Sequence, residues 1–249
     1  MVIQVFGSWP ALYLNNMLSI IIPTLNEEKY LPLLLESIKK QKFSDYEIIV
    51  SDGVSEDKTE SVASDYGCVF VQDQKRSPAR QRNRGAQEAK GDVLMFLDAD
   101  TVLPDNFLPA AYEEFKRRHL NSAGFYLHFN SRRALYRLFE ACYQSVCFVG
   151  QYFFPASVGV GIMAAIEAHR KIKGFDESIF IGEDYDYIKR LSKIGKYRMI
   201  TSCYLYFSVR RLEKEGVFKV LWKWFRGGLY FLVRGPIRRK IVNYEFGKY

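Results

Sequence analysis

The chain has 249 residues, 48% of them hydrophobic and 16% aromatic, which is enough to bury one large core or two small ones. Its four cysteines lack zinc-ligand spacing and are too few for a disulfide scaffold, so we expect buried thiols in a reducing compartment. The net charge of +8 lies entirely in residues 210–249, which hold 11 basic and 3 acidic side chains. The basic and acidic side chains of the first 209 residues are equal in number, so that part has a net charge of zero. A basic tail of this kind points to nucleic acid or to an anionic membrane surface.

No linker, repeat or low-complexity stretch divides the sequence, so one compact domain over 17–211 is predicted. Residues 1–16 carry no charge and lack the pattern of a signal peptide. We expect them to be a loose extension, with the functional chain starting near Met17. Residues 212–249 are predicted to form a basic, aromatic helical tail.

The first half of the chain alternates strands with helices. An apolar, β-branched run at 18–22, closed by Pro23, predicts a buried parallel strand. The acids that follow predict a helix capped by Thr24 or Asn26. The same signals predict strands at 47–51, 68–71 and 93–97, and intervening helices that begin near Ser55 or Asp57 and at Ser77. This alternation predicts a doubly wound, mostly parallel α/β sheet flanked by helices.

The second half is less regular. Residues 141–166 carry no charge and are long enough to span a bilayer, but they are interrupted by Pro155, Gly159, Gly161, Gln144 and Gln151. Two interpretations stay open, a membrane-inserted segment or a helix followed by a core strand. A turn is expected at 174–177, and a helix is expected from Gly182 to Gly195.

The predicted strand at 93–97 runs directly into Asp98-Ala99-Asp100. Ligands of open α/β sheets collect beyond the carboxyl ends of the strands. Two carboxylates at such an end suit Mg²⁺ or Mn²⁺, which complete their coordination with water and phosphate oxygens. The alternative is an acidic turn that caps the next helix.

Similar polar clusters follow other predicted strands or open predicted helices. In a doubly wound sheet these ends converge on one edge, so the clusters are expected to form one site. They are Thr24, Asn26 and Glu27; Asp52; Asp98 and Asp100; and Glu183 and Asp184.

This ordered set resembles the inverting family 2 glycosyltransferases, which have the GT-A fold. The resemblance covers about 18–211. It rests on Ile22-Pro23-Thr24-Leu25-Asn26-Glu27, on Asp52-Gly53 with Ser55, Asp57 and Thr59, on Arg80, Asn83 and Gly85, on Phe96-Leu97-Asp98-Ala99-Asp100, on Gly174-Phe175-Asp176-Glu177 and on Glu183-Asp184. It implies a nucleotide-binding half at 17–104 and an acceptor half at 105–211.

The resemblance also implies the reaction. A sugar would move from a nucleotide-diphosphate donor to a hydroxyl acceptor with inversion, and Mg²⁺ or Mn²⁺ would neutralise the departing diphosphate. Asp100 would ligate the metal directly, and Asp98 would hold the ribose or a metal-bound water. Asp184 would be the general base, with Glu183 beside it, because a neighbouring like charge raises the pKa of a carboxylate. Alternatively, both acids would only stabilise a helix N-terminus.

The remaining residues of these motifs are implied to contact the donor: Pro23, Thr24, Asn26, Glu27, Asp52, Arg80, Asn83, Asp98 and Arg211. Arg80 could reach base or phosphate, or could lie on a solvated helix face. Many relatives place a histidine late in the chain as a further metal ligand, but His119, His128 and His169 do not stand there. The implied metal would then be held by Asp100, diphosphate and water.

The aromatic content of the tail distinguishes between nucleic acid and a membrane surface, the two partners that a basic segment can have. Its cations lie near one helical stripe beside Trp, Phe and Leu side chains, which is typical of an interfacial helix rather than of a nucleic-acid site. The alternative is a helix packed on the catalytic domain. A cytoplasmic protein, peripheral on the cytoplasmic face of a membrane and acting on a lipid-linked or polysaccharide acceptor, would fit the first interpretation.

Three rival functions remain open. A phosphatase of the haloacid dehalogenase type also has a strand ending in Asp-x-Asp, but normally at its first strand, whereas three strands precede Asp98 here. A sugar-nucleotide pyrophosphorylase needs a glycine-rich loop after the first strand, and residues 24–28 contain no glycine. The third is a non-catalytic, membrane-associated module with a transferase-like fold.

Overall fold

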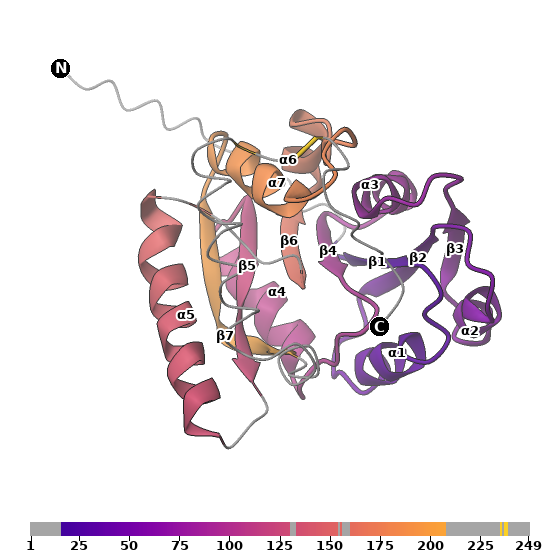
Figure 1. The fold of residues 1–249 in the computed structure, drawn as a ribbon, viewed down its shortest axis with the longest axis horizontal. Helices are drawn as coiled ribbons and strands as arrows, with labels where there is room; N and C mark the ends of the chain where they lie inside the picture. The colour runs from indigo at the N-terminus through magenta and orange to yellow at the C-terminus, as the bar shows by residue number, and fades with distance from the viewer. Residues whose placement is uncertain are drawn as a thin grey trace.

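The computed structural model describes residues 16–129, 133–153, 155, 160–207, 235 and 237–238. The extension at 1–15, Arg211 and nearly all of the tail at 212–249 lie outside these residues. The elements, in chain order, are β1 (Leu18–Thr24), α1 (Leu31–Lys39), β2 (Tyr46–Asp52), α2 (Thr59–Asp65), β3 (Val69–Gln72), α3 (Pro78–Glu88), β4 (Val93–Leu97), α4 (Phe107–Arg117), β5 (Ser122–Phe129), α5 (Ala134–Phe153), β6 (Gly161–Ala165), α6 (Ile166–Lys171), α7 (Glu183–Ser192) and β7 (Tyr197–Phe207) (Figure 1).

The strands form one sheet in the order β3-β2-β1-β4-β6-β5-β7. Neighbouring strands are parallel except at β6, which is antiparallel to β4 and to β5. The prediction of a mostly parallel α/β sheet is therefore confirmed. Because β1 lies between β2 and β4, the carboxyl ends of these three strands are neighbours.

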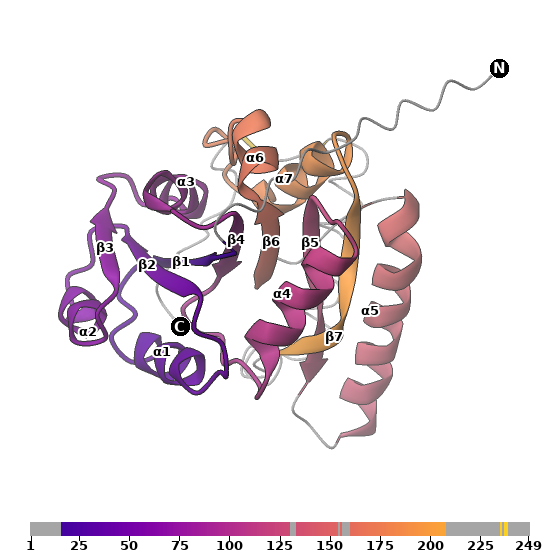
Figure 2. The same cartoon turned by 180° about the vertical axis from the view of Figure 1, so that it is seen from behind.

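The core follows the central strands. Every residue of β4 and β6 is buried, and the run Ile20–Ile22 of β1 has no exposed surface. Helices cover both faces of the sheet, with α1 and α2 on the opposite side of β1–β3 from α3 (Figures 1 and 2). Burial on both faces explains why these strands are continuous apolar runs rather than alternating ones.

The helix predicted directly after β1 begins later than expected. It starts at Leu31, its N-cap residue Tyr30 gives no side-chain cap, and Thr24 and Asn26 do not cap it. Asn26 instead adopts a left-handed backbone with φ of 58°, and its amide oxygen accepts a hydrogen bond from Glu56 N. The prediction was wrong because the Thr24 side chain binds Asp52 at the end of β2 and the Asn26 side chain binds the loop after it.

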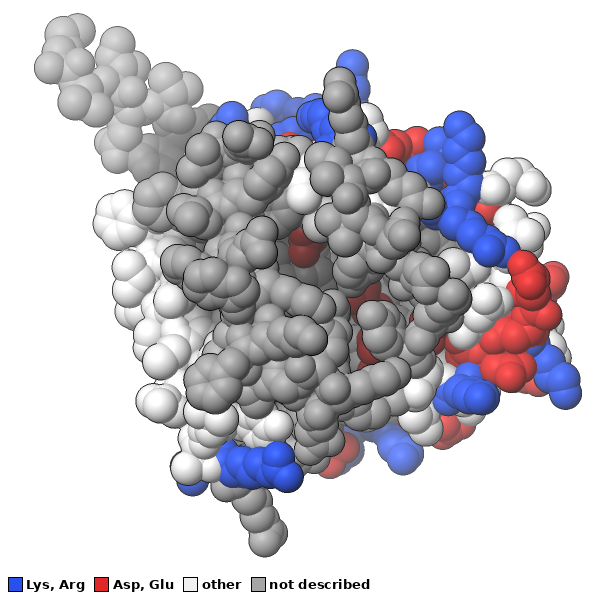
Figure 3. Space-filling model, in the orientation of Figure 1, with Lys and Arg blue, Asp and Glu red and all other residues white. Residues whose placement is uncertain are grey.

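Within 141–166, α5 ends at Phe153 and the core strand β6 spans Gly161–Ala165, as the second interpretation predicted. The strand β6 is inserted between β4 and β5, and α5 runs along the flank of β5 and β7 (Figure 1). That flank shows uncharged side chains along most of its length (Figure 3). Within the described residues, no helix combines the length and the apolarity needed to cross a membrane.

Candidate active site

The ends of β1 and β2 are joined by polar side chains. Thr24 Oγ1 donates to Asp52 Oδ1 at 2.8 Å, and Ser55 donates to both oxygens of Asp52, from Oγ at 2.6 Å and from the backbone N at 2.7 Å. Asp52 is 1% exposed, so its carboxylate is buried and accepts all three of these hydrogen bonds inside the protein. A carboxylate that accepts three such bonds is fixed in one orientation.

The loop after β1 is bonded along its length to the loop after β2. Asn26 N donates to Ser55 Oγ at 2.8 Å, and Glu27 N donates to Thr59 Oγ1 at 2.9 Å. Glu28 N donates to Asp57 Oδ2 at 3.0 Å. These hydrogen bonds join the two loops into one surface at the carboxyl edge of the sheet, which we call the donor wall. It holds the predicted donor residues Pro23, Thr24, Asn26, Glu27 and Asp52.

Helix α3 packs over this edge. Its N-cap Ser77 is extended and Pro78 occupies the first turn, as predicted. The buried Gln81 side chain donates to the backbone oxygens of Thr24 and Ser51, which end β1 and lie near the end of β2. The helix start is thereby held against both strand ends.

The next residue of α3, Arg82, connects the remaining acids. Its guanidinium donates to Asp98 Oδ1 at 3.0 Å and to Glu183 Oε1 at 2.9 Å, and its side chain is only 4% exposed. It also lies over the Phe175 ring, 5.4 Å from the centroid. A buried arginine between two carboxylates fixes the distance between the end of β4 and the start of α7.

The Glu183-Asp184 pair opens α7 after Gly182, whose φ of 90° is in the left-handed region. Desolvation raises the pKa of Asp184 to about 7, and the charge of Glu183 adds to the rise, while Arg82 opposes it. The backbone N of Tyr185 donates to Asp184 Oδ1 at 2.7 Å. A carboxyl group with this pKa is suited to proton transfer near neutral pH.

Asp98 and Asp100 differ in their surroundings although they are two residues apart. Desolvation raises the pKa of Asp98, Arg82 opposes the rise, and Asp100 adds to it. Asp100 is exposed, and within the described residues no hydrogen bond or ion pair is made to its carboxylate. The described residues contain no group of three His, Cys, Asp or Glu side chains that could hold a metal by themselves. Two carboxylates still suit a hard ion that takes its other ligands from diphosphate and water.

Arg80 and Asn83 are bonded to other parts of the protein. Arg80 pairs with Asp73 at 3.1 Å and with Glu177 at 2.7 Å. The Asn83 amide donates to Phe175 O and to Glu177, and its oxygen accepts from Phe175 N. These bonds fix the 174–177 turn against α3, and donor contacts of Arg80 and Asn83 stay predictions.

Only glycine fits at Gly174 in that turn. Its φ is 70°, and a Cβ atom there would collide with the Asn83 side-chain oxygen. The turn therefore brings Phe175 directly beneath Arg82, where it also stacks on Tyr187 with ring centroids 3.8 Å apart.

The chain matches two family profiles. The profile described as Glycosyl transferase family 2 matches residues 19–159, more than half of the chain, and the profile described as Glycosyl transferase family group 2 matches residues 93–242. The chain belongs to glycosyltransferase family 2. This membership excludes the haloacid dehalogenase type of phosphatase, and the chain is a glycosyltransferase rather than a non-catalytic module.

Two curated relatives illustrate the similarity of this family 2 glycosyltransferase. One, from Methanococcus voltae, is a dolichyl N-acetyl-alpha-D-glucosaminyl phosphate 3-beta-D-2,3-diacetamido-2,3-dideoxy-beta-D-glucuronosyltransferase, 26% identical over 88% of this chain and 80% of that protein. The other, the GalNAc(5)-diNAcBac-PP-undecaprenol beta-1,3-glucosyltransferase of Campylobacter jejuni, is 40% identical over 34% of this chain and 30% of that protein. The chain therefore spans most of the archaeal relative and less than a third of the bacterial one.

Solved structures of other glycosyltransferases share the fold. A Pyrobaculum calidifontis mannosyltransferase in complex with GDP-Man and Mn²⁺ has a TM-score of 0.67 at 18% identity, covering 84% of this chain and 64% of that one. Staphylococcus aureus TarS 1–349 in complex with UDP-GlcNAc has a TM-score of 0.63 at 20% identity, covering 77% of this chain and 58% of that one. This likeness confirms the predicted GT-A fold.

The histidines of this family 2 glycosyltransferase have partners away from the acidic site. His128 Nδ1 lies 2.7 Å from Glu140 on α5, and His169 Nδ1 lies 2.7 Å from the Tyr187 hydroxyl. Burial lowers the pKa of His169 to about 4, so this ring is a neutral part of the core. Neither histidine is placed to assist Asp98 and Asp100.

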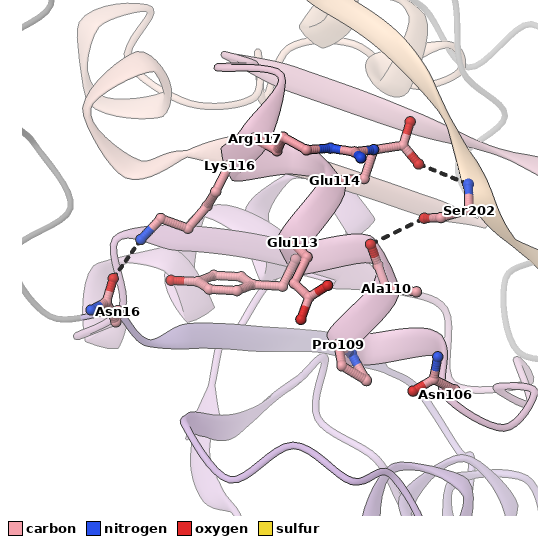
Figure 4. Close-up of a pocket in the computed structure, with 10 residues that line it drawn as sticks. Asn16, Asn106, Pro109, Ala110, Glu113, Glu114, Lys116, Arg117 and Ser202 are labelled. Carbon is pink, nitrogen blue, oxygen red and sulfur yellow. Dashed lines mark hydrogen bonds between the residues drawn. The ribbon is translucent and has the colours of Figure 1, made fainter.

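A separate cavity lies on the back of the sheet, between α4, β7 and Asn16 (Figure 4). Its volume is about 720 Å³, and none of the predicted site residues lines it. Glu114 is one of the residues that line this cavity. Burial raises the pKa of its carboxyl group, but hydrogen bonds from Ser202, Thr201 and Arg118 outweigh this effect and lower the pKa to about 2. These bonds tie α4 to β7, so the polar groups here stabilise the fold.

Proposed function

We propose that this glycosyltransferase transfers a sugar from a nucleotide-diphosphate donor to a hydroxyl of a lipid-linked acceptor, with inversion and with a divalent metal. The observation that carries the proposal is the buried Arg82, which joins Asp98 to Glu183 and keeps Asp184 at the same edge of the sheet. A structural salt bridge alone would not require two further carboxylates, Asp100 and Asp184, beside it.

The donor site is proposed at the wall formed by the β1 and β2 loops. Thr24, Asn26, Glu27 and Asp52 would hold the nucleoside there, since the wall is already braced before a donor arrives. The solved relatives hold UDP-GlcNAc or GDP-Man, which supports a nucleotide-diphosphate sugar without selecting between bases. Arg211, the other predicted donor contact, lies outside the described residues.

The metal site is proposed at Asp98 and Asp100. Mg²⁺ or Mn²⁺ bound there would act as a Lewis acid toward the departing diphosphate. Asp100 offers an exposed carboxylate, whereas Asp98 has one oxygen committed to Arg82 and one oxygen left for a water or a ribose hydroxyl. The oxygen-only donor set and the small number of protein ligands fit such ions. One of the solved relatives was crystallised with Mn²⁺.

Asp184 is the proposed general base. In a single displacement the acceptor hydroxyl attacks the anomeric carbon opposite the leaving diphosphate, and its proton passes to a carboxylate on the attacking side. Arg82 separates the two functions physically, because it binds Asp98 on one side and Glu183 on the other. A pKa raised to about 7 makes Asp184 a stronger base than an ordinary carboxylate.

The lipid-linked acceptor is proposed from the names of two relatives, which specify dolichyl phosphate and undecaprenol diphosphate carriers. Both relatives act on a sugar already attached to the carrier, so the acceptor atom here would be a saccharide hydroxyl. The division into halves at 17–104 and 105–211 and the interfacial tail at 212–249 stay predictions.

A panel of nucleotide-diphosphate sugars tests the reaction, with nucleoside diphosphate release followed with and without Mn²⁺. An acceptor of the polyprenyl-phosphate class carrying one sugar should raise the release rate and yield product of inverted anomeric configuration by NMR. Asp184→Asn should abolish transfer while leaving donor affinity within about threefold, because the base does not contact the donor phosphates. A wild-type transfer rate in Asp184→Asn, or a retained configuration in the product, would contradict the mechanism.

A further inference from the structure

Helix α5 exposes an apolar face. Side chains three, four or seven positions apart along Ala134–Phe153 share one side of a helix. On this side five large apolar residues are between 45% and 72% exposed: Leu135, Leu138, Val146, Val149 and Phe153. Large exposed patches on soluble proteins mark surfaces that bind something.

The other side of α5 is already in use. Tyr136 and Gln151 are buried, Gln151 accepts a hydrogen bond from Met199 N on β7 at 3.1 Å, and Glu140 accepts from Phe129 N on β5 at 2.8 Å. Polar anchors at both ends therefore fix which side of the helix faces outward. The exposed apolar side is a consequence of the fold and not of a loosely packed helix.

Among the described residues 133–153, the exposed charges are all positive. Arg133 and Arg137 are exposed at the start of α5, and Glu140, the acidic residue of the helix, faces inward toward His128. In the space-filling view, blue side chains gather at the lower end of the α5 flank, where the helix begins in Figure 1 (Figure 3). An apolar side that begins beside these cations is complementary to an anionic lipid surface.

We propose that the outer side of α5 docks on an anionic lipid bilayer, with the helix lying flat in the headgroup region. A helix of 20 residues is about 30 Å long, so the exposed stripe can engage lipid over several turns without crossing the membrane. The aromatic ring of Phe153 suits the boundary between headgroups and acyl chains, and the two arginines reach lipid phosphates.

The location explains why docking would serve the reaction, which rests on the proposed lipid-linked acceptor. Helix α5 contacts β5 and β7, and α7, which carries Asp184 in its first turn, contacts the same two strands. Tyr143, on the inner side of α5, packs against the core. The helix that meets the bilayer therefore lies on the same part of the sheet as the helix that carries the proposed base. An acceptor sugar on a membrane-embedded carrier would be presented close to Asp184.

A native cysteine allows a direct test. Cys142 is exposed and lies one turn from both Leu138 and Val146 on the docking side. The other three thiols are only partly exposed, and burial raises the pKa of Cys68 to about 11 and that of Cys203 to about 12, and also raises that of Cys147. Because thiolates react with maleimides, Cys142 should accept a polarity-sensitive label selectively.

The labelled full-length protein is mixed with vesicles of phosphatidylcholine, with or without about one third phosphatidylglycerol. With anionic vesicles we expect co-sedimentation, a blue shift of the label and quenching by lipids that carry a nitroxide near the headgroup. Leu138→Gln with Val146→Gln should weaken binding about tenfold or more, since two large apolar side chains no longer enter the lipid. The matched control is Leu33→Gln on α1, where an apolar side chain is 54% exposed on another surface. The contribution of charge is tested with Arg137→Gln, which removes a cation beside the docking side and should weaken binding to the anionic vesicles. Its matched control is Lys171→Gln, which removes an exposed cation at the end of α6.

Several outcomes would overturn the proposal. A label that stays in water while the protein sediments places the membrane contact elsewhere, and no sedimentation removes the contact. A label shielded without vesicles indicates a second copy if light scattering gives a doubled mass, or a covering segment of the same chain if it does not. Because docking is measured without donor or acceptor, its failure leaves the proposed transfer reaction standing. Loss of transfer in every donor assay would leave docking intact.

Discussion

Replacing Arg82 by glutamine removes a buried positive charge and leaves a shorter, neutral side chain that can still form hydrogen bonds. In the wild type, Arg82 is 4% exposed and pairs with Asp98 at 3.0 Å and with Glu183 at 2.9 Å. Removing one member of a buried charge network costs about 3–5 kcal/mol because the remaining charges lose their partner. Glu183 is 15% exposed and Asp98 is 37% exposed, so water compensates part of this loss. We therefore expect the free energy of unfolding to fall by about 2–4 kcal/mol.

The same substitution should change the acid–base behaviour of the site. Arg82 lowers the pKa of both Asp98 and Asp184, so its removal should raise both values. At pH 7 a larger fraction of Asp184 would then be protonated and unable to accept the acceptor proton. The ascending limb of the pH profile, along which kcat/KM increases with pH, should shift to higher pH. The kcat at pH 7 should fall about tenfold or more.

Urea denaturation and a pH–rate profile measure the two effects separately. Arg170→Gln is the matched control, because Arg170 pairs with Glu167 at the surface with both side chains about half exposed. An exposed pair contributes less than about 1 kcal/mol, so this variant should match the wild type. An Arg82→Gln protein with wild-type stability and an unshifted pH limb would show that Arg82 does not connect the two halves of the site.

Three further outcomes are expected. The kcat/KM of the wild type should rise with pH through a limb near neutrality, because Asp184, as the proposed base, would have to lose its proton and its pKa is raised to about 7; a profile that is flat from pH 5 to 8 would contradict this. Asp100→Ala should lower metal-stimulated turnover about 100-fold and bring it to the level of the wild type in EDTA, as steady-state kinetics would show. Gly174→Ala should lower the free energy of unfolding by about 1–3 kcal/mol, measured by urea denaturation, because an alanine at a φ of 70° is strained and would push against Asn83; wild-type stability would count against that account.

The order of strands and helices could be predicted from the sequence because apolar runs and turn residues are local signals. The runs before Pro23 and before Asp98 both proved to be buried strands, and β6 was expected within 141–166 as a strand. The start of α1 could not be predicted in this way. Thr24 and Asn26 are good caps by composition, but hydrogen bonds to Asp52 and Glu56 compete for them, and those partners are about 30 residues away.

The acids of the site could be predicted because each one follows a strand or opens a helix. Arg82 could not, since within the cluster Arg76, Arg80, Arg82 and Arg84 each arginine has the same composition signal. Its burial depends on which side of α3 faces the sheet. The available signal was spacing: Arg82 stands one turn after Ala79 and three residues before Gly85, and both of these small residues face the core. A small–x–x–Arg–x–x–small pattern places the arginine on the buried side of an amphipathic helix.

Three consecutive residues of α3 reach three different parts of the site. Gln81 binds the ends of β1 and β2, Arg82 binds Asp98 and Glu183, and Asn83 binds the turn at 174–177. Successive side chains of a helix diverge by about 100°, so these three residues point in three directions and bind three segments that are far apart in the sequence. Because α3 binds all three segments, a displacement of this helix would move the proposed donor wall, Asp98 and the Glu183-Asp184 pair together. In the proposed reaction, α3 would therefore set the separation between the leaving group and the base, which an in-line displacement requires to be fixed.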